Sequence, residues 1–185
     1  MKKRCEWAKI EPNTTYHDKE WGIPQHSDKK LFEFLILEGA QAGLSWSTIL
    51  NRRDGYRLAF SNFDAVKVSK YTPNHVKKLI QNKAIIRNKL KINSAINNAR
   101  QFIKIQKEFG SFDEYLWGFV NHKPIKNKFK KYSDLPSYTT ISKKLSQDLK
   151  KRGFNFVGPT ICYALMQAVG MVNDHTIDCF RYSKL

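Results

Sequence analysis

The residue with the clearest chemical potential is a glutamate in an apolar helical stretch. Glu38 follows Leu31 and Leu35 at helical spacing, so the three side chains fall on one inward face of a helix. A carboxylate on such a face costs free energy unless another group pairs with it or a ligand uses it. Glu38 therefore predicts either a buried polar contact or a binding site for a cationic ligand.

Two segments, 5–22 and 37–46, are dense in residue types that can form a binding site, and the second contains Glu38 and Trp46. Ring faces near one carboxylate form a box for a flat, cationic ligand, because rings supply stacking and cation–π attraction and the carboxylate a charge-assisted acceptor. These rings could equally be plain core, with Glu38 bonded to a buried N–H or lysine. The aromatic candidates are Trp7, Tyr16, Trp21 and Trp46.

Small residues and one leucine follow Glu38 directly. Gly39 and Gly43 allow a close approach of backbone to a ligand, and Leu44 could act as a wedge in a base stack. This neighbourhood favours the ligand site over the plain core.

Two histidine–cysteine pairs lie near opposite ends of the chain: Cys5 with His17, and His175 with Cys179. On a helix, the second pair would point both ligands the same way. Two sulfur and two nitrogen ligands suit a closed, tetrahedral, structural zinc site that ties the termini together. Two unrelated surface pairs are the alternative. The third cysteine, Cys162, lies in an apolar helix and is predicted to be a core residue.

A short turn joins two predicted helices near residues 150–159. Gly153 and Gly158 permit conformations closed to other residues, and Pro159 would open the second helix. The free N–H groups of that helix start can bind phosphate, with Lys151 and Arg152 beside them. The alternative is an ordinary helix-turn-helix corner, in which the Lys and Arg side chains at the end of the first helix are only solvated.

Helices must position all these residues, since hydrophobic spacing is helical almost throughout and alternating strand patterns are missing. The predicted fold class is all-α. Capping residues, prolines and glycines place helices at 28–38, 45–56, 72–80, 87–109, 115–120, 138–152 and 159–170.

The chain has 185 residues, which predicts one domain over 1–185. Its formal net charge of +17 favours a polyanionic partner such as nucleic acid, although codon bias toward lysine would give a similar balance. No apolar run approaches the roughly 20 residues that span a bilayer, and no secretory signal is present. We expect a cytoplasmic protein without membrane contact.

Six motifs, in order from residue 4 to residue 179, resemble the bacterial 3-methyladenine-DNA glycosylase I family of the helix-hairpin-helix glycosylase superfamily. The motifs are Arg4-Cys-x-Trp7, Tyr16-His-Asp-x-Glu-Trp-Gly22, Leu37-Glu-Gly-x-Gln-Ala-Gly-Leu-Ser-Trp46, Trp117-x-Phe-Val-Asn-His-x-Pro124, Lys151-Arg-Gly-Phe-x-Phe-Val-Gly158 and Val172-Asn-Asp-His-x-x-x-Cys179.

The resemblance implies a role for each candidate. Glu38 would recognise the excised base, and zinc would join the terminal segments, about 1–20 and 171–185. The base would be held by Tyr16, Trp46, Trp7 and Trp21. The gap in the duplex would be filled by Gln41, Gly43 and Leu44. Phosphates would be bound by Lys151, Arg152, Gly153, Gly158 and Thr160. The zinc ligands would be Cys5, His17, His175 and Cys179.

The implied activity is hydrolytic removal of 3-methyladenine from double-stranded alkylated DNA by a monomer, leaving an abasic site. No lysine occupies the usual nucleophile position, where Pro159 and Thr160 stand, so we expect no strand cleavage. Asp174 stands near the place where the wider superfamily has a water-activating aspartate; it is interpreted as a supporting residue, with a catalytic part as the alternative. The chain departs from the family at Asn13 and Thr14, where a second tyrosine is common. A non-enzymatic DNA-binding protein and a zinc-stabilised RNA-binding protein are the alternatives.

Overall fold

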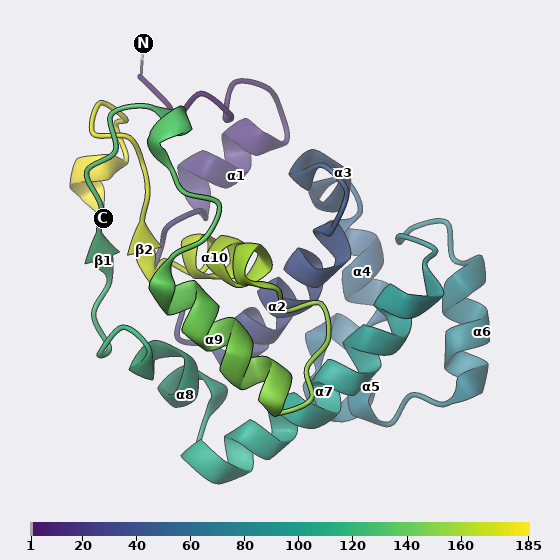
Figure 1. Cartoon of the computed structure of the whole chain (residues 1–185). Coiled ribbons are helices and arrows are strands. Elements are labelled where there is room, and N and C mark those ends of the chain that lie inside the picture. The colour runs from purple at the N-terminus through teal and green to yellow at the C-terminus, as the bar shows by residue number, and fades with distance from the viewer. Residues whose placement is uncertain (1) are drawn as a thin grey trace.

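Helix α2 (Asp28–Gln41) lies at the centre of the computed structural model shown in Figure 1, which describes residues 2–185. Every residue from Leu31 to Ala40 is buried. This is expected for a helix that is covered on all sides. Its neighbours are α3 (Trp46–Leu50), α7 (Lys89–Phe109), α8 (Phe112–Gly118) and α10 (Pro159–Ala168).

The described residues are mostly helical, which confirms the predicted fold class in its coarse form. None of the helices within residues 2–185 is long and apolar enough to cross a bilayer. The remaining α-helices are α1 (Asn13–Lys19), α4 (Arg53–Ala59), α5 (Ala65–Ser69), α6 (Pro73–Gln81) and α9 (Thr140–Lys151). Short 3-10 turns cover Ser61–Phe63, Tyr132–Asp134 and Tyr182–Lys184.

The prediction missed the short helices α1 and α5, and two further details were wrong. A parallel pair of two-residue strands, β1 (Ile125–Lys126) and β2 (Val172–Asn173), joins the middle of the chain to its C-terminal segment. Strands this short leave no alternating pattern in the sequence. The single helix predicted over 45–56 is two helices, because the chain turns at Asn51, whose N–H bonds the carbonyls of Ser47 and Ile49.

Helices α9 and α10 form a hairpin that packs against α7. Gly153 ends α9 with a φ of +86°, a conformation that favours glycine. Phe154 and Val157 are buried beneath the turn. Asn98 of α7 fixes the turn through both backbone groups of Asn155, accepting from its N–H and donating to its carbonyl, each at 2.9 Å. The hairpin is therefore held rigidly to the core.

The two terminal segments lie side by side, as Figure 1 shows. The Phe180 N–H donates to the Lys3 carbonyl at 2.9 Å. Lys3 also pairs with Asp178 at 2.6 Å. This arrangement brings residues from both ends of the sequence into one site.

Candidate active site

A cavity of about 540 Å³ opens between α1, α2, α3, α10 and the loop 132–137. Its walls combine aromatic rings with a few polar groups, as is typical of ligand sites. It brings together residues that the resemblance placed in three separate roles: Glu38, Tyr16, Trp46, Trp7 and Trp21 at the base, Gln41 at the gap in the duplex and Thr160 at a phosphate.

Glu38 is buried in this cavity, with 4% of its surface exposed. No group within residues 2–185 pairs with its carboxyl, and burial raises its pKa from 4.5 to about 8. Glu33, on the same helix, shows the contrast. Its carboxylate bonds Arg53 at 2.7 Å and Lys30 at 2.9 Å, and these cations lower its pKa despite its burial. Of these two buried glutamates, only Glu38 keeps its acceptor oxygens available to a ligand.

Within the part of the chain that the structure describes, three buried polar atoms around Glu38 also lack a hydrogen-bond partner: the Tyr16 hydroxyl, Trp46 Nε1 and Asn13 Oδ1. All three residues line the cavity. Unpaired buried polar atoms are rare in folded proteins, so three in one cavity indicate a polar ligand. The rings of Tyr16 and Trp46 lie 5.3 Å apart between centroids, so they pack on each other and leave room for a flat ligand beside them rather than between them.

Trp7 and Trp21 form the wall between this cavity and the termini. Their rings meet edge to face at 4.9 Å. Trp7 also packs on His17 at 5.4 Å, and Trp21 packs on His175 at 4.6 Å. Both tryptophans therefore touch the cavity on one side and the histidines on the other.

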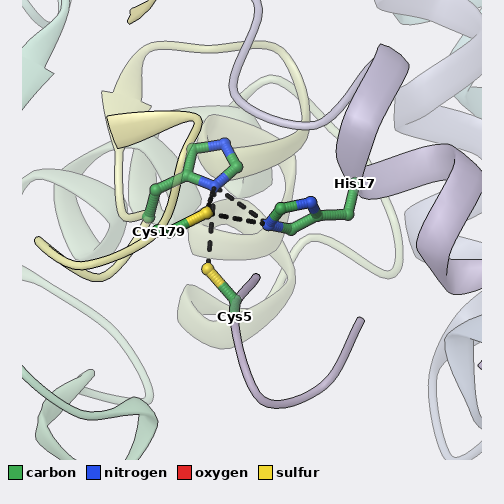
Figure 2. Close-up of side chains that lie close together, drawn as sticks. Cys5, His17 and Cys179 are labelled. Atoms are coloured by element: carbon green, nitrogen blue, oxygen red, sulfur yellow. Dashed lines mark hydrogen bonds between the residues drawn. The ribbon is translucent and has the colours of Figure 1, made fainter. Parts of the chain in front are cut away.

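The four predicted metal ligands converge in one buried cluster, part of which is drawn in Figure 2. Cys5, His17, His175 and Cys179 place their ligand atoms within 4.8 Å of one another. Three of the four sulfur–nitrogen separations are 3.4–3.6 Å, and the two histidine nitrogens lie 3.2 Å apart. A tetrahedral zinc with ordinary bond lengths requires about 3.6 Å and about 3.4 Å for these separations.

The second nitrogen of each histidine is also occupied. His17 Nδ1 contacts Asp18 Oδ1 at 2.9 Å, and His175 Nε2 contacts the Trp21 carbonyl at 3.2 Å. Metal-bound histidines are held this way in proteins, with the outer N–H given to a carboxylate or carbonyl. Arg4 pairs with Asp18 and holds its pKa down to about 2, so this carboxylate stays ionised. The donor set and its surroundings fit zinc.

A tight turn, Gln41–Leu44, follows α2 at the cavity wall. The Leu44 N–H donates to the Gln41 carbonyl at 2.7 Å, and Gly43 takes a φ of +76°. Ala42 has φ −44° and ψ 116°, so this is a type II turn, in which the third position favours glycine. Gly43 is exposed, and a Cβ there would meet nothing within 4 Å. Gly39 does not face the cavity opening but packs against Phe156 of the hairpin.

Helix α10 presents one face to the cavity and its N-terminus to the hairpin. Thr160, Tyr163, Ala164 and Gln167 follow helical spacing along the cavity wall. Lys151 is exposed at the end of α9. Arg152 differs from the expectation for a phosphate contact, because its guanidinium is already bonded to Glu108 and Asp148, each at 2.7 Å. Thr160 contributes to the cavity as well as to the start of α10.

Sequence reasoning assigned no site role to Asn13, to three residues of α10 or to the loop 132–137. The helical spacing of Tyr163, Ala164 and Gln167 from Thr160 was a usable signal, and Asn13 stands where the family commonly has a tyrosine, whereas the loop carried no signal. Asp174 lies behind this wall and is buried. It accepts hydrogen bonds from Tyr163, Gln167 and Asn127, and it does not line the cavity. Asp174 therefore orders Tyr163 and Gln167 of the cavity wall, and its supporting role stays a prediction.

Comparison with known proteins identifies the family. The model of the methyladenine glycosylase family matches residues 7–182. DNA-3-methyladenine glycosylase 1 of Escherichia coli is 47% identical over 180 residues, covering 97% of this chain and 96% of that protein. A crystal structure of 3-methyladenine DNA glycosylase I superposes with a TM-score of 0.94 at 44% identity, covering 96% of this chain and 98% of the other.

A structure of the Staphylococcus aureus 3-methyladenine DNA glycosylase I, described as the structural basis of 3-methyladenine recognition, superposes with a TM-score of 0.93 at 35% identity. It covers 96% of this chain and 95% of the other. These matches span nearly the whole length of each protein, and they agree with the cavity chemistry. The chain therefore belongs to the methyladenine glycosylase family.

Proposed function

We propose that this chain is a base-excision DNA glycosylase that removes 3-methyladenine from double-stranded alkylated DNA. It acts as a single domain and a monomer. The observation that carries the proposal is the unpaired Glu38 carboxyl in an aromatic cavity. Methylation at N3 makes adenine a flat cation, and this pairing of charge with ring faces suits such a ligand. The relatives named above carry the same activity in their names.

Selectivity for the damaged base follows from electrostatics. The enzyme turns the nucleotide out of the duplex, and the base enters the cavity beside the rings of Tyr16 and Trp46. A cationic base favours the ionised form of Glu38, which then gives up its proton to solvent. Neutral adenine provides no such compensation, so it leaves a costly buried carboxyl in place. The Tyr16 hydroxyl, Trp46 Nε1 and Asn13 Oδ1 supply directional contacts to the edge of the base.

The chemical step is loss of a good leaving group. The bond between C1′ of the sugar and the base nitrogen breaks with its electron pair going to the base, which departs as neutral 3-methyladenine. Water adds to the oxocarbenium-like C1′ and releases its proton to solvent. Because the base carries its charge before the bond breaks, the protein needs no acid to protonate it. Binding that favours the separated charge distribution accelerates the reaction.

The strand backbone is held by the α9–α10 pair, which we interpret as a helix-hairpin-helix. Gly153 and Gly158 shape the hairpin, and the free N–H groups at the start of α10 face a phosphate. Lys151 adds a cation near it. Thr160 lies at both the helix start and the cavity wall, which connects the grip on phosphate with the base site.

The product is an abasic site, and strand cleavage is not expected. Cleavage by this class of enzyme needs an amine at C1′ to form a Schiff base. Among residues 2–185, the cavity lining contains no lysine.

Zinc is proposed as the resident metal of the Cys5–His17–His175–Cys179 cluster, one ion per chain. With four protein ligands it has no open position, so its contribution is structural. It fastens the two terminal segments behind Trp7 and Trp21.

The test is release of free base from methylated duplex DNA, with the purines separated and identified by mass. Selective release of 3-methyladenine over 7-methylguanine supports the proposal. No release by folded, zinc-loaded protein would overturn it and favour a DNA-binding protein without enzyme activity. Binding to methylated and intact duplexes with equal affinity would point the same way, and tighter binding to single-stranded RNA would favour the RNA-binding alternative.

A further inference from the structure

The Gln41–Leu44 turn receives a cation from another helix. Lys91 of α7 donates from its Nζ to the Ala40 carbonyl at 2.8 Å and to the Ala42 carbonyl at 2.6 Å. These carbonyls belong to the end of α2, where several C=O groups lack partners within the helix. No basic residue lies in the last turn of α2 itself. Lys91 therefore supplies the positive charge that favours a helix C-terminus.

Lys91 serves α2 at the expense of its own helix. It lies in the first turn of α7, where a positive charge opposes the helix dipole and where no acidic residue compensates it. Its backbone is fixed there, because the Lys91 N–H donates to the Asn88 side chain at 3.1 Å. Its side chain is half-buried, and burial lowers its pKa. The contacts of the Lys91 ammonium with the end of α2 offset this cost.

These contacts help to fix the conformation of the Gln41–Leu44 turn. The exposed Gly43 gives the backbone freedom, and two hydrogen bonds hold the turn from within: Leu44 N–H to the Gln41 carbonyl, and Gln41 Nε2 to the Leu44 carbonyl at 2.6 Å. The contacts from Lys91 to Ala40 and Ala42 fasten its first half to α7. Together these four bonds fix the direction in which Leu44 leaves α2.

We propose that Lys91 is a positioning residue for DNA distortion: its ammonium clamps the Ala40 and Ala42 carbonyls and so presents Gly43 and Leu44 to the gap left by the extruded nucleotide. This inference rests on the proposed glycosylase function. Lys91 touches neither the base nor the reacting sugar. Its contribution is to make the turn rigid before DNA binds. Ordering Gly43 and Leu44 then costs little free energy when the nucleotide is extruded.

The experiment compares Lys91→Met with Lys89→Met. Methionine keeps most of the side-chain volume but removes the charge and the donors. Lys89 is an exposed residue two positions before Lys91 on the same helix. Its variant therefore removes the same charge without changing a contact to the turn. Single-turnover base release is measured on a methylated duplex and on a duplex in which the lesion faces an abasic analogue and is already weakly stacked.

We expect Lys91→Met to slow release from the paired duplex by about tenfold relative to Lys89→Met, as for loss of charge-assisted hydrogen bonds. On the weakly stacked lesion, the difference should shrink to less than about threefold, because little wedging is needed there. Equal rates for the two variants on the paired duplex would overturn the inference. Equal loss on both substrates would also overturn it, since it would indicate a general structural defect.

A second readout is independent of activity. Hydrogen exchange at the Leu44 amide, which donates to Gln41, should be faster in Lys91→Met than in Lys89→Met. Unchanged exchange would contradict the clamp. If the wild-type protein released no base from either duplex, the proposed function would fail, and the exchange result would still decide the role of Lys91 in the turn.

Discussion

Tyr16 and His17 are neighbours in α1, and their side chains belong to two different sites. The Tyr16 hydroxyl lies in the aromatic cavity, while His17 Nε2 lies 3.2 Å from His175 Nδ1 in the cysteine–histidine cluster. One turn of helix thus connects the proposed base site to the proposed zinc site. A shift of α1 after metal loss would move the Tyr16 hydroxyl with it.

Metal loss should therefore weaken both stability and base binding. We expect Cys179→Ser to reduce zinc below half an equivalent per chain and to lower Tm by on the order of 10 °C, because a structural zinc contributes several kcal/mol to folding. Affinity for 3-methyladenine should fall as well. Elemental analysis, thermal unfolding and calorimetric titration with the free base measure these effects.

Cys162→Ala provides the matched control, because Cys162 is buried in α10 outside the cluster. It should keep a full equivalent of zinc. A Cys179→Ser protein with unchanged metal content would refute the four-ligand site, whereas normal base affinity after complete metal loss would refute only the connection through α1.

Glu38 should make the protein less stable as pH rises. The folded protein holds the Glu38 proton up to about pH 8, while a glutamate in the unfolded chain releases it near pH 4.5. Between these values the folded state binds more protons, so its free energy of unfolding falls with pH. Above pH 8, the free energy of unfolding should be lower than at pH 4 by on the order of 5 kcal/mol on account of this group. Chemical denaturation at pH 5, 7 and 9 would measure it.

Glu38→Gln removes this titration, and at pH 9 it should be more stable than the wild type. It should also weaken binding of the methylated duplex and lower base release, because the amide cannot become an anion opposite the cationic base. Excision by the wild type should rise between pH 6 and 8, and the variant should lack that rise. Wild-type excision kinetics in the folded variant would remove Glu38 from its proposed role.

Two adjacent basic residues of the hairpin should behave differently. Lys151 is exposed, whereas Arg152 is bonded to Glu108 and Asp148 and packs over the rings of Phe109 and Tyr115 at 5.0 and 5.2 Å. We expect Lys151→Ala to leave Tm unchanged and to reduce the slope of log affinity against log salt by about 0.9. Arg152→Ala should lower stability by about 1 kcal/mol with little change in that slope.

Binding titrations at several salt concentrations, together with thermal unfolding of both variants, separate these effects. A large change of salt slope in Arg152→Ala alone would restore the phosphate contact first predicted for Arg152.

The sequence was most informative where local chemistry determines structure. Helix starts at Asp28 and Pro159 and the stop at Gly153 follow from capping and backbone rules, and the structure places them within two residues of expectation. The isolated carboxyl of Glu38 was visible because it interrupts an apolar face. The meeting of Cys5 with Cys179 needed the resemblance, since spacing alone says nothing about residues 174 positions apart.

Features that depend on tertiary contacts could not be predicted. The pairing of Arg152 with Glu108 joins residues far apart in sequence, whereas its second partner, Asp148, lies four residues before it and was a usable signal. In the sequence, Lys91 is indistinguishable from a solvated lysine, because its contact with the end of α2 depends on how α7 packs. The loop 132–137 has no periodic pattern, so its place in the cavity wall could not be predicted.

Asn13 provides a last prediction, because its Oδ1 is buried in the cavity wall without a hydrogen-bond partner. A lone buried acceptor is costly in the empty protein, and a donor on the base would relieve that cost. We expect Asn13→Ala to weaken binding of the methylated duplex by about fivefold, the contribution of one neutral hydrogen bond, without lowering Tm. Asn13→Asp keeps an acceptor and adds negative charge near a cationic base, so its affinity should match or exceed that of the wild type. Equal affinities for Asn13→Ala and wild type would show that Asn13 makes no contact with the base, and a loss in Asn13→Asp as large as in Asn13→Ala would show that the contact uses the amide N–H₂ group.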